Sequence, residues 1–245
     1  MSESAMLDSC RDMVAARLSE DLAQILAQVV GELTELASKM PAQDVYSLYM
    51  DSMELARDQS AAITASFKKN FFTRFNECKR RVRHEPASLS GARNLDLSTL
   101  SLLEPDDLEE SLAANTIANA IANTCGEELF GLGKRMGVLL NEPDLKTEQI
   151  PLGPEVIGTA LLDALKDQNA SVKIKLMLVS QINKPFPAKV RSVYQEVNRH
   201  LVEHNVLPTI RVSLTRAASS PASASAPMAA PVAANPGSDP GSAVA

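Results

Sequence analysis

Tryptophan is absent from this chain of 245 residues, and aromatic side chains make up only 4% of it. Glycine is also scarce, at 10 residues, whereas alanine and leucine are frequent. Few glycines and aromatics beside many helix formers predict helices and argue against sandwiches and barrels. Because 45% of the residues are apolar, the chain can still build a sizeable core.

Cysteine is also rare: Cys10, Cys78 and Cys125 are odd in number, far apart and without a CxxC pair. This argues against a disulfide framework or a structural zinc site and predicts reduced thiols in the cytoplasm. The N-terminus lacks the basic and apolar regions of a signal peptide. No run of about 18 apolar residues occurs, so no membrane span is expected. No cofactor is expected either. The net charge of -6 argues against attraction of the whole molecule to nucleic acid.

Two long helices are predicted first. Apolar residues at three- and four-residue steps indicate a helix from Ala5 to Met40, which Pro41 ends. A second helix is expected from Asp44 to Arg83, and the tight connection predicts an antiparallel hairpin. Its buried stripe is predicted to be Ile63, Phe67, Phe71, Phe75, Cys78 and Val82.

A loop is expected near residues 85–100, and 95–102 alternates in a strand-like way. A third helix is predicted from Pro105 to Leu140, followed by shorter ones near 154–166, 171–183 and 187–204. We therefore predict an all-α fold, with a long helical hairpin over 1–84 and a helical bundle over 94–210. Residues 217–245 contain little besides Ala, Ser, Pro and Gly and are expected to form a disordered tail or linker. A chain ending on a linker suggests the front part of something longer.

Several segments resemble a known family. They include the run from Leu100 to Asn115, Glu127-Glu-Leu-Phe130 with Arg135, Pro151 to Pro154, and Val193-Tyr-Gln-Glu-Val-Asn198. Together they resemble the N-terminal part of the bacterial domain-of-unknown-function family 1631, over residues 5–210. Members are usually longer, and some carry a thymidine phosphorylase label. Gly131 and Gly133 depart from the family pattern and predict a weakened or bent helix there.

No enzyme site is predicted. His200-Leu-Val-Glu203-His204 spells the inverted zinc-protease pattern, and its two histidines would share one helical face. That class needs a further acidic ligand downstream, and only Asp239 follows, so we interpret the match as two surface histidines. The run Gly126 to Lys134 has the GxxxxG spacing of a P-loop but carries Leu132 where a P-loop has lysine. We therefore do not interpret it as a nucleotide-binding loop.

A basic stretch is the strongest candidate binding surface. It comprises Lys68, Lys69, Arg74, Lys79, Arg80, Arg81 and Arg83. Such a run is commonly a solvated helix face, and cations suit a helix C-terminus. The alternative is docking to nucleic acid or another anionic partner.

Three asparagines, Asn115, Asn119 and Asn123, form a second candidate surface, on a polar stripe beside a ridge of alanines. The stripe is either a solvated face or a hydrogen-bonding seam for a partner helix. The sequence as a whole favours a non-catalytic scaffold or signalling adaptor that binds a protein partner or self-associates. Nucleic-acid or anionic-ligand binding through the helix over 68–83 is the alternative.

Overall fold

The computed structural model describes residues 2–39, 43–84 and 105–210. Within these ranges it holds eight α-helices, one short 3-10 helix and no strand, which confirms the predicted all-α class. Met1–Ile210 forms one compact unit, so the helices of the two predicted regions pack together. The strand-like segment 95–102 and the tail 217–245 lie outside the described residues. None of the described helices is long and apolar enough to cross a membrane.

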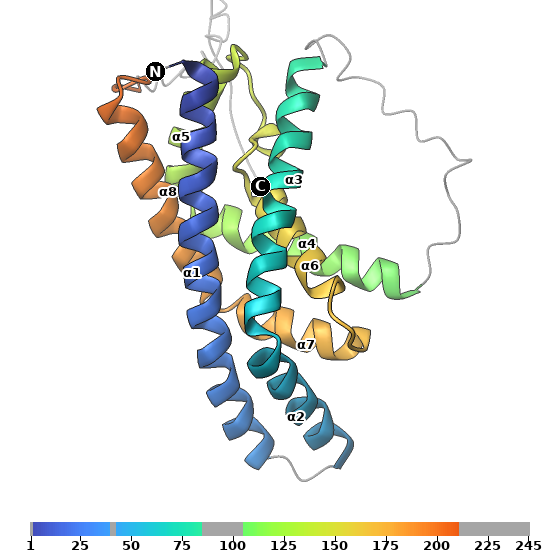
Figure 1. The fold of residues 1–245 in the computed structure, drawn as a ribbon. Coiled ribbons are helices and arrows are strands. Elements are labelled where there is room, and N and C mark those ends of the chain that lie inside the picture. The colour runs from blue at the N-terminus through green and yellow to red at the C-terminus, as the bar shows by residue number, and fades with distance from the viewer. Residues whose placement is uncertain (1, 40–42, 85–104, 211–245) are drawn as a thin grey trace, which may run out of the picture. The chain divides into compact units, whose positions relative to one another are not determined.

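Helix α1 (Glu3–Ser38) is the longest element and spans about 54 Å at 1.5 Å per residue. The side chain of Ser2 caps its start by accepting a hydrogen bond from the amide of Ala5. Its buried residues recur at three- and four-residue steps from Met6 to Ala37. Helix α2 (Gln43–Asp58) returns beside it, and α3 (Ser60–His84) continues upward, as Figure 1 shows. The predicted hairpin is therefore present.

The helix predicted over 44–83 is in fact two, because the chain bends at Gln59 between α2 and α3. The amide of Gln59 still bonds to the carbonyl of Leu55, and Ile63 bonds back to Gln59. Backbone hydrogen bonding therefore continues through the bend. Asp58 and Ser60, which flank it, are weak helix formers.

The helix predicted over 105–140 also divides, into α4 (Pro105–Thr124) and α5 (Gly126–Leu140). Cys125, with φ -108° and ψ 20°, marks the break between two residues of low helix propensity. Helix α5 runs through Gly131 and Gly133 without a break, and a weakening or bend of the helix there stays a prediction. The apolar residues that recur at three- and four-residue steps through this region are all buried: Ile117, Ile121, Cys125, Leu129, Leu132, Met136 and Leu139.

The 3-10 helix η3 (Thr147–Gln149) leads to three further helices: α6 (Pro154–Lys166), α7 (Val172–Ile182) and α8 (Phe186–Glu203). Pro154 begins α6 at a position where a backbone N–H would have no hydrogen-bond acceptor within the helix, so proline costs nothing there. Helix α8 lies along α1 on the side away from α3 (Figure 1). A Cβ on Gly158 would stand 3.0 Å from the carbonyl oxygen of Ala114, so glycine and the alanine ridge let α6 and α4 approach closely.

Aromatic side chains of α3 fill the centre of the core. Phe67, Phe71 and Phe75 are fully buried, as the predicted stripe required. The ring of Phe67 meets that of Phe186 edge-on at 6.4 Å and so joins α3 to the start of α8. The buried hydroxyl of Tyr194 donates a 2.7 Å hydrogen bond to the carbonyl of Leu152, which fixes the loop before α6 to α8.

Candidate functional site

The basic residues predicted as a binding surface divide into two groups. Four are exposed on α3 and have no ion-pair partner among the described residues: Lys68, Lys69, Arg80 and Arg81. Arg74 and Lys79 are instead engaged inside the compact unit. The side chain of Arg83 lies outside the described residues. Of the predicted binding surface, the four exposed cations are therefore the ones that remain available to a partner.

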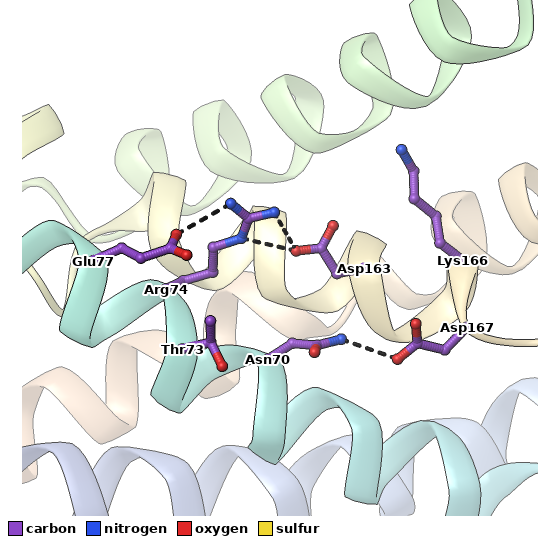
Figure 2. A pocket seen from close by; sticks show the side chains of 7 residues that line it. All are labelled: Asn70, Thr73, Arg74, Glu77, Asp163, Lys166 and Asp167. Atoms are coloured by element: carbon purple, nitrogen blue, oxygen red, sulfur yellow. Dashed lines mark hydrogen bonds and ion pairs between the residues drawn. The ribbon is translucent and has the colours of Figure 1, made fainter.

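Arg74 links α3 to α6 across the hollow shown in Figure 2, which has a volume of about 310 Å³. Its Nε and Nη2 lie 2.9 and 2.8 Å from Oδ2 of Asp163, and its Nη1 lies 3.3 Å from Oε2 of Glu77. The hydrogen bond with Asp163 is the main reason why the pKa of Arg74 is raised. Asn70 donates to Asp167 at 3.2 Å beside this group. Because the opposite charges form ion pairs with one another, the arrangement is better explained as a cross-link between α3 and α6 than as a ligand site.

Lys79 links α3 to α1. Its Nζ lies 3.4 Å from Oδ1 of Asp8 and 3.3 Å from the hydroxyl of Ser4, and 6.0 Å from the centre of the Phe75 ring. The Lys79 side chain is only 14% exposed. Two of the seven predicted cations thus hold the fold together, which local sequence cannot reveal because their partners are about 70 or more residues away.

The predicted asparagine stripe lies on the solvent side of α4. Asn115, Asn119 and Asn123 are all exposed, and their side chains make no hydrogen bond within the described part of the chain. Ala118 and Ala122 are turned more toward the interior. The stripe is therefore accessible to a partner, and a binding role for it stays a prediction.

The two histidines of the HxxEH run lie at the end of α8. Their ring centres are 4.4 Å apart, with His200 half-buried and His204 exposed. Across residues 2–39, 43–84 and 105–210, no group of three or more His, Cys, Asp or Glu side chains is placed to hold a metal ion. Asp239 lies outside these residues, so the pair has no further acidic ligand within the described chain.

A polar network joins α5 to α8, with Glu128 at its inner side and Arg191 and Gln195 at the surface, and the sequence did not predict it. Oε1 of Glu128 accepts hydrogen bonds from Nε of Arg191 and Nε2 of Gln195, both at 2.8 Å. Burial pushes the pKa of Glu128 upward, but the bonds from Arg191 and Gln195 outweigh it, so the pKa falls below 4.5. The other carboxylate oxygen, Oε2, is buried without a partner among the described residues.

The same network continues to Arg135, which is only 8% exposed. Asn198 connects the two parts, since its Nδ2 donates to the carbonyl of Glu128 at 2.9 Å while its Oδ1 accepts from Nη1 of Arg135 at 2.8 Å. Burial lowers the pKa of Arg135, which has no carboxylate partner in the described part of the chain. A Cβ on Gly131 would stand 2.9 Å from that Nη1, so the glycine makes room for the guanidinium. The sequence signal for this buried arginine was weak, because Arg135 directly follows the exposed Lys134 in α5.

An apolar hollow of about 390 Å³ opens beside the first turns of α5. It is lined by Ala122, Gly126, Leu129, Phe130, Gly133, Lys134, Leu145, Thr147 and Ile150. Phe130 at its rim is 50% exposed, and so is Val138 two turns along the same helix. The residues Phe130, Lys134 and Val138, together with this hollow, are called the α5 surface below.

Comparison with known proteins agrees with the resemblance in the sequence. No curated protein and no solved structure matches the chain. The family model described as protein of unknown function (DUF1631), N-terminal domain, matches residues 2–205. Because the match covers most of the chain, this protein belongs to that family.

Proposed function

We propose that this chain is a non-catalytic protein-interaction module of the cytoplasm, and that it docks its partner on the α5 surface. The observation that carries the proposal is the half-exposed Phe130 at the rim of an apolar hollow. Single exposed apolar residues are ordinary on protein surfaces. Phe130 and Val138 are eight residues apart on one side of α5, however, and a concave apolar site lies beside Phe130.

The energetics favour a polypeptide segment as the occupant. Covering the exposed half of Phe130 contributes about 1 kcal/mol, by the usual value for burying a phenylalanine side chain. A stable complex needs several such contacts, which an amphipathic helix supplies at three- and four-residue steps. A helix lying along α5 would reach from Phe130 to Val138, about 12 Å at 1.5 Å per residue.

Charge narrows the class of partner further. Lys134 is the single charged residue among those lining the hollow, and it has no ion-pair partner in the described part of the chain. We therefore propose a partner helix that places a large apolar side chain in the hollow and a carboxylate beside Lys134. The complementary charge would set register and orientation more than affinity.

Photo-crosslinking in cells that express the chain tests the proposal. A photoreactive phenylalanine analogue replaces Phe130, and the matched control carries it in place of Tyr46, an exposed aromatic residue on α2. The peptide captured at position 130 is mapped, synthesised and titrated against the purified chain. We expect an amphipathic segment with acidic residues, and an affinity that falls about tenfold in Lys134→Glu because a favourable charge becomes a like charge.

Three results would overturn this proposal. They are equal capture at positions 130 and 46, capture of a second copy of the chain, and peptide binding that is indifferent to Lys134→Glu. Circular dichroism on Lys134→Glu separates loss of binding from loss of fold, and the exposed position makes loss of fold unexpected.

A second candidate function is binding of nucleic acid or another polyanion through α3. It is favoured by the exposed cations Lys68, Lys69, Arg80 and Arg81, none of which is neutralised by an ion pair among the described residues. The test compares Arg80, Arg81 and Arg83→Ser with a control that removes equal charge, Lys39, Lys146 and Lys173→Ser. Salt-sensitive binding to DNA or RNA that is lost only in the arginine variant would support it. Equal loss in both variants would contradict it.

A further inference from the structure

The end of α8 carries two imidazole rings held side by side. His200 lies in its last turn and His204 caps it, and their ring centres are 4.4 Å apart with planes tilted by 52°. This juxtaposition follows from their four-residue spacing on one helical face. The site is separate from the α5 surface, and the proposed docking function does not use it.

A hydrogen bond fixes which nitrogen of His204 is free. Its Nδ1 lies 2.8 Å from the carbonyl oxygen of His200. Because a carbonyl oxygen only accepts hydrogen bonds, Nδ1 carries the proton, and Nε2 of the neutral ring keeps its lone pair. A backbone carbonyl bonded to the other ring nitrogen is the usual support of a metal-ligating histidine.

His200 is held from the other side. Its Nε2 lies 3.4 Å from the hydroxyl of Ser9 on α1, and the residue is half-buried. The hydroxyl can donate or accept, so either nitrogen of His200 can remain unprotonated. Because one ring is restrained by α1 and the other by the backbone, little side-chain freedom is lost when both bind one ligand.

The ring separation is close to what a shared ion requires. With metal–nitrogen bonds of about 2.0–2.1 Å, two imidazole centres lie roughly 4.5 Å apart at a right angle and roughly 5 Å apart at the tetrahedral angle that zinc prefers, so the rings would open by less than about 1 Å to hold one zinc ion. We infer that His200 and His204 form a two-histidine site for a divalent transition-metal ion of the imidazole-binding class, such as Zn²⁺. Water fills the other positions, since no third His, Cys, Asp or Glu ligand stands with them within the described ranges.

The charges around the pair are mixed. A cation at a helix C-terminus is favoured by the free carbonyl groups there, and Glu203 is the adjacent residue in the chain. Arg199 also lies on this last turn and opposes a second positive charge. With two protein ligands the ion would exchange with solvent, unlike one in a four-ligand structural site.

Calorimetry with zinc chloride on the full chain, prepared without a histidine tag, tests the inference. We expect one ion per chain and an affinity that falls about tenfold or more in His204→Ala and His204→Gln. His84 is the one other histidine of the chain, so His84→Gln is the matched control and should bind zinc as the parent does. Magnesium, which prefers oxygen ligands, should not compete.

A second readout does not depend on calorimetry. The amides of His204, Asn205 and Val206 bond back to the last turn of α8. Zinc should slow their hydrogen exchange, because it fastens position 204 to position 200. Equal zinc affinity in the parent and His204→Ala would overturn the inference, as would loss of binding in His84→Gln. Circular dichroism confirms that each variant is folded, which is expected because His204 is exposed.

Discussion

Asn198 holds the guanidinium of Arg135 in place from the neighbouring helix, with Oδ1 2.8 Å from Nη1. The arginine is buried and has no carboxylate partner among the described residues. The amide oxygen of Asn198 is therefore the main hydrogen-bond acceptor for its charge. The other end of the same amide bonds to the carbonyl of Glu128. One neutral side chain thus satisfies a cation on α5 and a carbonyl about two turns earlier on the same helix.

Replacing Asn198 by alanine should lower the free energy of unfolding by about 2 kcal/mol, since a hydrogen bond to a buried charge is lost. Urea titration followed by circular dichroism measures the change. Asn119→Ala, at an exposed asparagine with no hydrogen bond in the described chain, should change stability by less than about 0.5 kcal/mol. In an Arg135→Met background the cost of Asn198→Ala should shrink, because the buried cation is then gone. An unchanged cost in that background would contradict the assigned coupling.

Two glycines in helices should respond to alanine in opposite directions. A Cβ at Gly137 would stand 2.6 Å from the carbonyl oxygen of Glu142, where the chain turns back through the left-handed Asn141. Since a backbone atom must move, Gly137→Ala should lower the free energy of unfolding by about 1–3 kcal/mol. Gly31 meets nothing within 4 Å, so Gly31→Ala should raise it by about 0.5–1 kcal/mol. Thermal unfolding of both variants checks the signs, and stabilisation by both would contradict the close approach at Gly137.

Much of the fold can be predicted from the sequence because long helices bury one periodic face. The stripe from Ile63 to Val82 and the one from Ile117 to Leu139 are both buried as their spacing predicts. The breaks at Gln59 and Cys125 leave only a weak signal, the low helix propensity of the residues that flank them. Neither position is proline, and backbone bonds continue through each of them, so the sequence alone does not show that a helix ends there.

The candidate sites are less predictable, because a side chain's role depends on residues far away in the sequence. Arg74 and Arg80 look alike within the basic stretch, yet only Arg74 meets Asp163, 89 positions later. From the sequence, Gly131 is simply a residue that weakens a helix. The structure shows that a side chain there would occupy the space of the Arg135 guanidinium. The HxxEH motif likewise predicts that His200 and His204 share a helical face. It does not predict the hydrogen bond to the carbonyl of His200 that fixes the tautomer of His204.

Glu128 should make the fold more sensitive to acid. Burial opposes its ionisation, but hydrogen bonds from Arg191 and Gln195 prevail and hold its pKa below 4.5. A pKa lowered by folding contributes stability that is present above the unfolded value and is lost as the pH falls through the folded value. The stability advantage of the parent over Glu128→Gln should therefore be constant near neutral pH and shrink below pH 4.5. Urea titrations from pH 7 to pH 3 measure it, with Glu127→Gln, an exposed neighbour without a hydrogen bond among the described residues, as the control.

An advantage of the parent that stays constant down to pH 3 would show that the Arg191 and Gln195 bonds do not favour the ionised carboxylate. An advantage that grows in acid would give the opposite sign, as expected if burial alone governed Glu128. Arg191→Met offers a second check, since removing the strongest of these donors should weaken the acid dependence without removing the carboxylate.

The three cysteine thiols should not react with thiol reagents until the protein unfolds. Burial raises the pKa of Cys10 to about 12 and those of Cys78 and Cys125 to about 11. All three are free and buried, so both the thiolate fraction and access for a reagent are low at pH 8. Titration with an aromatic disulfide reagent should release almost no thiolate from the native chain and three equivalents in denaturant. Rapid reaction of one thiol in the native state, with the helical signal intact, would show that the helix covering it opens locally, and single Cys→Ser variants would identify that helix.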